Sequence, residues 1–268
     1  MSPRCLVATR ALLASILFVC SSIACSAEGI DDTEQSKGLL KDIRLYFTSP
    51  LRWDSKDWLL VGGAVATVGI AHHYDEDARA HFVRNGISST ASSHELDDAL
   101  PAAAALAGTW LAATLWRDSS GYREFWAMTE SAALSGVTAY ALKFAAGRQR
   151  PSETADPNSW RHGGDSFPSL HTTTAFAIGT VLAESGNEDY RWVRRTLGYG
   201  IGIVTAYQRV KHNRHWLSDT VAGAALGAST AYFVIDRHST HAAGHPTSEF
   251  AFVPIDGGVE LSYSLALK

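Results

Sequence analysis

Six apolar segments, separated by polar connections, run through the central part of the chain. They are rich in Ala, Gly and Thr, and their charged residues sit at the ends or at single sites such as Glu130. Apolar runs of this length indicate helices, and small residues let helices approach one another closely. We therefore predict an all-α bundle of six helices, over residues 58–72, 100–116, 125–146, 170–183, 197–209 and 217–235.

Local start and stop signals agree with these boundaries. Asp54 or Ser55 is placed to cap the first helix. Pro101 lies near the start of the second helix, and Pro151 is expected to stop the third.

The helix lengths leave the relation to a membrane open. They run from about 13 to 22 residues, which straddles the ~20 residues that cross a bilayer. An Ala-heavy composition and a mean hydropathy of −0.04 favour a periplasmic bundle that lies on a membrane or is tethered to one. If all six helices spanned, an exported start would place the motifs described below in the cytoplasm, and a start retained in the cytoplasm would place them outside.

The N-terminus is predicted to be an export signal covering residues 1–27. Arg4 and Arg10 precede an apolar run, 11–20, and small residues continue to Ala27. Cleavage is expected before Cys25, either by the ordinary route or by lipoprotein processing; a retained anchor helix is the alternative. The cysteines all lie in this segment, so the mature chain has no disulfide and no thiol catalysis: Cys5, Cys20 and Cys25.

The remaining regions flank the helical domain, which we place at 57–237. Residues 28–56 are polar and charged, and residues 238–268 form a linker and a small tail. Alternating apolar residues at 250–255 and 259–267, around Asp256-Gly257-Gly258, predict a C-terminal β-hairpin. The histidines at 238, 241 and 245 could suggest a metal site, but a polar linker is the interpretation we adopt.

Overall charge limits the function. A net charge of −4 and a pI near 6.2 exclude a general nucleic-acid binder, which needs a basic face. Any anion site must therefore come from a local concentration of cations.

Two stretches offer such a concentration. Lys143 and Arg150 are two helical turns apart, which predicts that both project from one face at the end of the third helix. Ser169 and His171 then stand at the start of the fourth helix, where backbone N–H groups favour an anion. Plain alternatives are a basic helix C-terminus, which also suits Arg148, and simple N-capping by Ser169.

A third stretch supplies a possible nucleophile. His215 and Asp219 are four residues apart, so they can meet on one helical turn, where a carboxylate would fix the imidazole tautomer and free the other nitrogen to attack. Arg209 would clamp a phosphate. The plain alternative is an ordinary i,i+4 pair.

Together these stretches, KFAAGRQRP, PSLH and QRVKHNRHWLSD, resemble the type 2 phosphatidic acid phosphatase (PAP2) and vanadium haloperoxidase superfamily, over about residues 125–235. The resemblance implies a bundle of that type. It implies that His215 is the nucleophile forming a phosphohistidine, that Asp219 orients it, and that His171 protonates the leaving group and later activates water. The phosphate would be held by a fixed set of side chains: Lys143, Arg150, Ser169 and Arg209. No metal is implied, and vanadate is expected to bind as a phosphate mimic.

Two residues depart from the family pattern: Leu170 replaces the usual Gly, and Gln208 replaces the usual Ser. Neither performs bond-making chemistry, so we expect an active phosphatase acting on a phosphomonoester or diphosphate, lipid-borne and outside the cytoplasm, with a membrane surface as partner. The alternatives are a soluble, broad-specificity periplasmic acid phosphatase, a vanadium haloperoxidase, and a non-catalytic binding protein.

Overall fold

The computed structural model describes residues 41–84, 94–186, 188, 190–243, 249–255 and 258–264. The chain divides into two compact units, Met1–Leu51 and Arg52–Lys268. In the first unit residues 41–48 are helical. A short 3-10 helix, η1 (Ser49–Arg52), includes the last residues of this unit and the first residue of the second. The predicted export signal, 1–27, lies outside the described residues.

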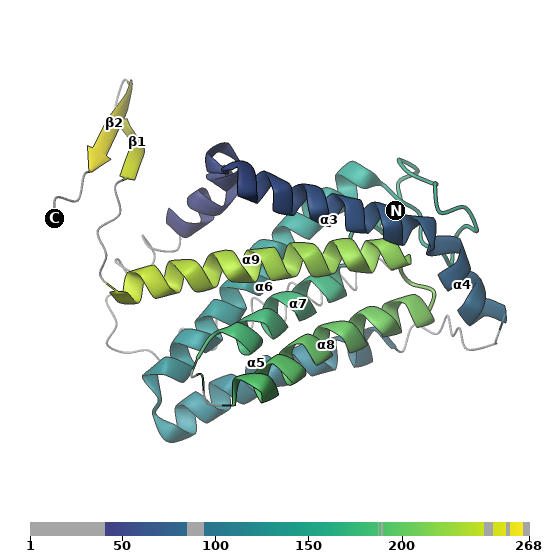
Figure 1. Cartoon of the computed structure of the whole chain (residues 1–268), viewed down its shortest axis with the longest axis horizontal. Coiled ribbons are helices and arrows are strands. Elements are labelled where there is room, and N and C mark those ends of the chain that lie inside the picture. The colour runs from purple at the N-terminus through teal and green to yellow at the C-terminus, as the bar shows by residue number, and fades with distance from the viewer. Residues whose placement is uncertain are drawn as a thin grey trace. The chain divides into compact units, whose positions relative to one another are not determined.

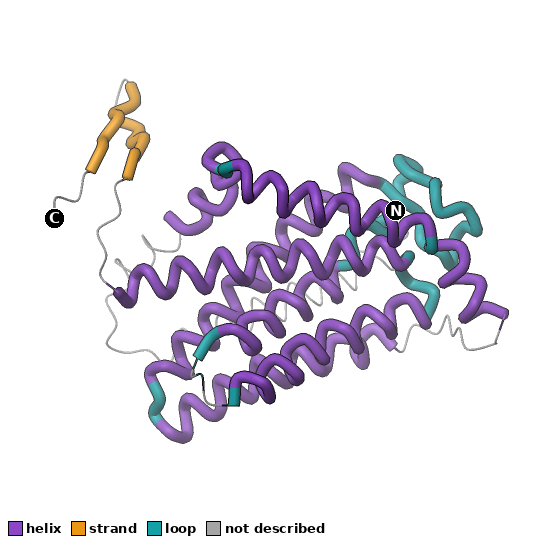
Figure 2. The backbone as a smooth tube through the Cα atoms, in the orientation of Figure 1, coloured by secondary structure: helices purple, strands orange, loops and turns teal. Residues whose placement is uncertain are grey.

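Helices dominate the second unit, as the apolar pattern predicted (Figures 1 and 2). They are α3 (Ser55–His73), α4 (Asp75–Arg84), α5 (His94–Trp116), α6 (Ser119–Ala146), α7 (Leu170–Glu184), α8 (Arg191–Lys211) and α9 (Leu217–Ala243). Six of them correspond to the predicted segments. The count of six is nevertheless too low for the described part of the chain, which adds α4 and the helix at 41–48.

The extra helix α4 was missed because it has no apolar run. Its sequence, DEDARAHFVR, is mostly charged. The order of those charges suits a helix, since Asp75, Glu76 and Asp77 lie in the first turn and His81 and Arg84 in the last, which complements the helix dipole.

Helix α7 forms the core of the bundle, packing against α6, α8, α9 and α5. Close approach depends on glycines, as the small-residue composition predicted. A β-carbon at Gly179 would lie 2.2 Å from the Gly198 carbonyl oxygen on α8, and one at Gly227 on α9 would lie 2.1 Å from the Thr173 carbonyl oxygen. Neither position can hold a side chain without moving a helix backbone.

The helix ends show which signals act. Asp54 caps α3 as predicted, accepting from the backbone N–H groups of Lys56 and Asp57. Helix α6 ends at Ala146, as the predicted segment does, because Gly147 takes a left-handed conformation (φ 54°) and its N–H donates to the Lys143 carbonyl. Pro151 is therefore not the stop signal, and Arg150 does not lie on α6.

Differences also occur near the C-terminus. Helix α9 continues to Ala243, so the polar linker does not begin at 238. In the tail β1 (Glu249–Ile255) pairs with β2 (Gly258–Ser264) as an antiparallel pair, with Glu249 opposite Ser264.

Many large apolar side chains face outward. Leu59 on α3 and Trp116 at the end of α5 are both 77% exposed, and Trp192 on α8 is 74% exposed. Within the described residues, one helical stretch, Ala99–Trp116, is long and apolar enough to cross a membrane. Exposed apolar surface of this extent usually marks an interaction surface.

Candidate active site

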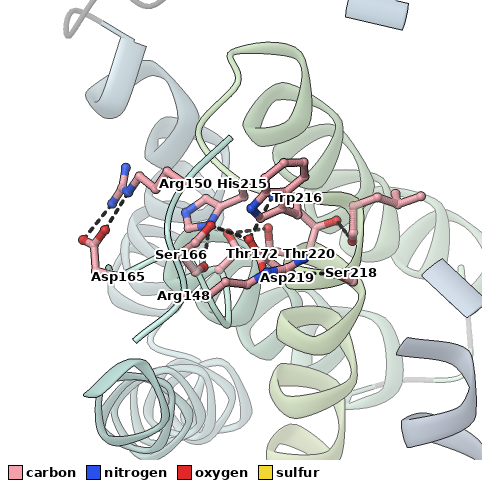
Figure 3. Close-up of polar contacts among 12 residues, drawn as sticks. Arg148, Arg150, Asp165, Ser166, Thr172, His215, Trp216, Ser218, Asp219 and Thr220 are labelled. Atoms are coloured by element: carbon pink, nitrogen blue, oxygen red, sulfur yellow. Dashed lines mark hydrogen bonds and ion pairs between the residues drawn. The ribbon is translucent and has the colours of Figure 1, made fainter. Parts of the chain in front are cut away.

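The ends of four helices and two loops carry the predicted residues. Lys143 lies in the last turn of α6, Arg209 in the last turn of α8 and Asp219 in the first turn of α9. Ser169 and His171 stand at the start of α7, while Arg150 and His215 lie in the loops before α7 and α9. Because α6, α7, α8 and α9 pack together, these positions converge, and Figure 3 shows His215, Asp219 and Arg150 in one region.

His215 is fully enclosed and held in one tautomer. Its Nδ1 lies 2.7 Å from the Ser166 carbonyl oxygen, and because a carbonyl only accepts, Nδ1 carries the proton. The other ring nitrogen, Nε2, is left with its lone pair. The nearest oxygen of Asp219 is 3.7 Å from Nδ1, within ion-pair distance but too far for a hydrogen bond, so the Nδ1 proton is accepted by the Ser166 carbonyl.

The reason is local. His215 precedes α9, which begins at Leu217, so the two residues do not share a helical turn. Asp219 instead bonds back to the Trp216 backbone N–H at 2.9 Å.

The surroundings of His215 disfavour its cation. Burial lowers its pKa well below the usual value, and the positive charges of Lys143, Arg209 and Arg150 lower it further, while Asp165 opposes them. Three cations from three separate segments therefore act on the ring electrostatically. A neutral imidazole with a free Nε2 is the form that can act as a nucleophile.

The cations are themselves constrained. Burial lowers the pKa of Lys143 to about 8, with Asp165 opposing and Arg150 reinforcing that shift. The Lys143 ammonium donates to the Asp165 carbonyl oxygen. Arg209 is only 1% exposed.

Asp165 is a site residue that sequence reasoning missed. Its carboxylate accepts two bonds from Arg150, from Nε at 2.7 Å and from Nη2 at 2.9 Å (Figure 3). Burial works against ionisation of Asp165, but Arg150 and Lys143 outweigh it and hold its pKa below the usual value. A phosphate entering the site would compete with this carboxylate for Arg150.

Asp219 is held from three sides. Its Oδ1 accepts from Arg148 Nη1 at 2.6 Å, and its Oδ2 accepts from the Ser166 hydroxyl at 2.5 Å and from the Trp216 N–H. Burial raises the pKa of Asp219, and Arg148 and these hydrogen bonds oppose that effect. Arg148 was interpreted from sequence as a helix-terminal charge; the structure makes it a buried partner of Asp219.

The structure shows the surroundings of Ser169 and of Leu170 and Gln208, the two residues that depart from the family pattern. The Ser169 side chain makes no capping bond; its oxygen accepts from the Thr172 hydroxyl at 3.0 Å, which leaves its own O–H to donate elsewhere. Leu170 packs toward α6, where a β-carbon at Gly136 would lie 3.8 Å from its Cδ1. Gln208 is half-buried on α8.

Among the residues that the structure describes, no group of three or more His, Cys, Asp or Glu side chains is placed to hold a metal ion.

Comparison with known proteins points to one family. A lipid A 1-phosphatase of Porphyromonas gingivalis is 38% identical over 95 residues, which cover 35% of this chain but 19% of that protein. This chain therefore aligns with a small fraction of its relative's length. No solved structure matches. Residues 124–242, which include every predicted site residue, match the family model of the PAP2 superfamily.

Proposed function

We propose that this protein is a metal-independent phosphatase that cleaves a phosphomonoester or diphosphate through a phosphohistidine. The observation that carries the proposal is the buried, neutral His215, whose Nδ1 donates to Ser166 and which lies amid three cations. Such an arrangement suits attack on a dianion whose oxygens need positive partners.

The reaction has two steps. In the first, His215 Nε2 forms a bond to phosphorus while the bond to the leaving oxygen breaks, and His171 gives its proton to that oxygen. In the second, His171 takes a proton from water, whose oxygen attacks phosphorus and breaks the P–N bond. The released phosphate leaves His215 neutral and His171 protonated, which restores the starting state. Phosphate oxygens are held throughout by the same set: Lys143, Arg150, Ser169 and Arg209.

The substrate we propose is lipid-linked, of the phosphatidate or prenyl diphosphate class. A lipid phosphatase is among the relatives, and the exposed apolar side chains of α3, α5 and α8 offer a surface to a membrane. The enzyme would then work outside the cytoplasm at that surface.

A soluble acid phosphatase is the second candidate, because the lowered pKa of His215 keeps the ring neutral, and hence nucleophilic, in mild acid.

Phosphate release tests the proposal directly. Purified protein in chelator should release phosphate from phosphatidate, a prenyl diphosphate or p-nitrophenyl phosphate, and His215→Ala should lose this activity by ~10³-fold or more, as for other covalent nucleophiles. Vanadate should inhibit, since it mimics the bound phosphate. Release that is unchanged in folded His215→Ala, or that vanishes with chelator, would contradict the mechanism.

A further inference from the structure

A buried chain of three charged side chains stands behind the proposed nucleophile. Arg148 follows the Gly147 turn and is completely buried. Its Nη1 reaches Asp219 at 2.6 Å, and its Nη2 reaches the Asp75 carboxylate at 2.7 Å. One guanidinium is thus shared by two carboxylates, both inaccessible to solvent.

Asp75 is the last member of this network of three side chains, and it lies outside the segment that matches the family. It is the first residue of α4, well before residue 124, where the PAP2 match begins. Its carboxylate also accepts from the Ser218 backbone N–H at 2.8 Å and from the Ser218 hydroxyl at 2.6 Å. It therefore holds the start of α9, the turn that carries Asp219.

The surroundings of Arg148 leave it no alternative position. Its Nε and Nη2 both donate to the Pro157 carbonyl, at 3.1 and 2.7 Å. The guanidinium lies 4.4 Å from the Trp160 ring centre and 5.3 Å from that of Trp216. Buried polar networks that are fully bonded fix the geometry of their members.

The second carboxylate, Asp75, affects how much of the negative charge of Asp219 remains after it pairs with Arg148. Arg148 alone would hold Asp219 in place but cancel its negative charge, which lies 3.7 Å from the imidazole that becomes positive on phosphorylation. A second carboxylate, Asp75, restores a net charge of −1 to the chain of three, so Asp219 can be both anchored and electrostatically effective.

We propose that Asp75 and Arg148 are positioning residues for the phosphohistidine step, setting both the place and the effective charge of Asp219 beside His215. This rests on the proposed function. The other charged or titratable groups that face this region come from α3, α6, α8 and the loop before α7: His72, Lys143, Arg209, Arg150 and Asp165.

The test uses two substitutions of opposite charge effect in the full-length protein. Asp75→Asn removes a negative charge, which should lower the pKa of both Asp219 and His215 and move the acid limb of kcat/KM to lower pH. Arg148→Met removes a positive charge and should move the same limb to higher pH. Each shift should be about one pH unit, the size expected for one unit charge inside a protein.

Controls separate charge from folding. Asp77→Asn makes the same chemical change two residues away on the exposed side of α4 and should leave the limb in place. Arg148→Lys keeps the charge and should return the limb toward the wild-type position. Circular dichroism and thermal unfolding establish that each variant is folded; if Arg148→Met is not, the comparison of Asp75→Asn with Asp77→Asn decides.

A second readout does not require turnover. Titration of the His215 ring nitrogens by ¹⁵N NMR should show a lower pKa in Asp75→Asn and a higher one in Arg148→Met. Opposite shifts support the proposal even if no phosphatase activity is found, whereas loss of activity in wild type would count against the proposed function alone. Two results would overturn the proposal. One is that the acid limb of kcat/KM and the His215 pKa stay at the wild-type values in Asp75→Asn. The other is that they move in the same direction in both variants.

Discussion

At the scale of single residues, the local sequence identified the groups proposed to touch phosphate but not the groups that hold them. Lys143, His171 and His215 stand out because they occur in spaced motifs. Asp75 does not, since nothing in the local sequence distinguishes it from Glu76 and Asp77 in the same turn. Its partner Arg148 is 73 positions away, a separation across which no periodicity operates.

One residue-scale prediction concerns alkaline pH. Burial brings the pKa of Lys143 down to about 8, so its ammonium loses a proton as the pH rises through 8 and the site loses a positive charge. Vanadate inhibition and substrate affinity should therefore weaken above pH 8, with KM rising while the protein stays folded.

Lys143→Arg provides the control for this prediction, because a guanidinium remains charged over that range. Its binding should be weaker in absolute terms, given the different geometry, but flat between pH 7 and 9.5. A wild-type KM that is constant over the same range would show that Lys143 keeps its proton.

At the scale of elements, the apolar pattern predicted the six long helices well because burial of an apolar face drives both pattern and structure. It failed where other forces decide. Helix α4 depends on its terminal charges and on buried Asp75. The apolar segment ended at 146, as α6 does, but the stop signal is Gly147 and not the nearby Pro151, so Arg150 lies in a loop. Sequence therefore predicted which segments are helical better than where Arg150 and His215 lie.

The glycine contacts between helices give an element-scale prediction. Gly227→Ala would place a β-carbon 2.1 Å from the Thr173 carbonyl oxygen and 2.9 Å from the Ala177 nitrogen. Since α9 would have to move away from α7, the free energy of unfolding should fall by about 2 kcal/mol or more, measured by thermal or denaturant unfolding.

Gly200→Ala in α8 is the matched control. A β-carbon there meets nothing within 4 Å, so the better helix propensity of Ala should leave stability unchanged or raise it by up to ~1 kcal/mol. Equal effects of the two substitutions would show that the α7–α9 spacing is not set by this contact.

At the scale of the whole molecule, the apolar composition that builds the bundle also covers much of its outside. Trp58 and Leu60 on α3 and Leu115 on α5 are all more than half exposed. Composition alone did not predict this, because a mean hydropathy near zero does not say which apolar residues face outward.

The exposed surface leads to a prediction about the assay. In mixed micelles the protein should stay dispersed and cleave a phosphorylated lipid, and removal of detergent should reduce that rate and cause association, measured by light scattering. Hydrolysis of soluble p-nitrophenyl phosphate should depend less on the micelle. Full dispersion and unchanged lipid turnover without detergent would favour the soluble acid phosphatase.

The position of Asp75 also affects how far the catalytic module extends. The family segment begins at residue 124, but the Ser218 N–H and hydroxyl and one side of the Arg148 guanidinium find their acceptor on α4. A fragment cut at the family boundary would bury a cation against a single carboxylate and leave the first turn of α9 short of an acceptor. Grafts and chimaeras should therefore take their upstream junction before α3, so that the donor segment carries its own counter-charge.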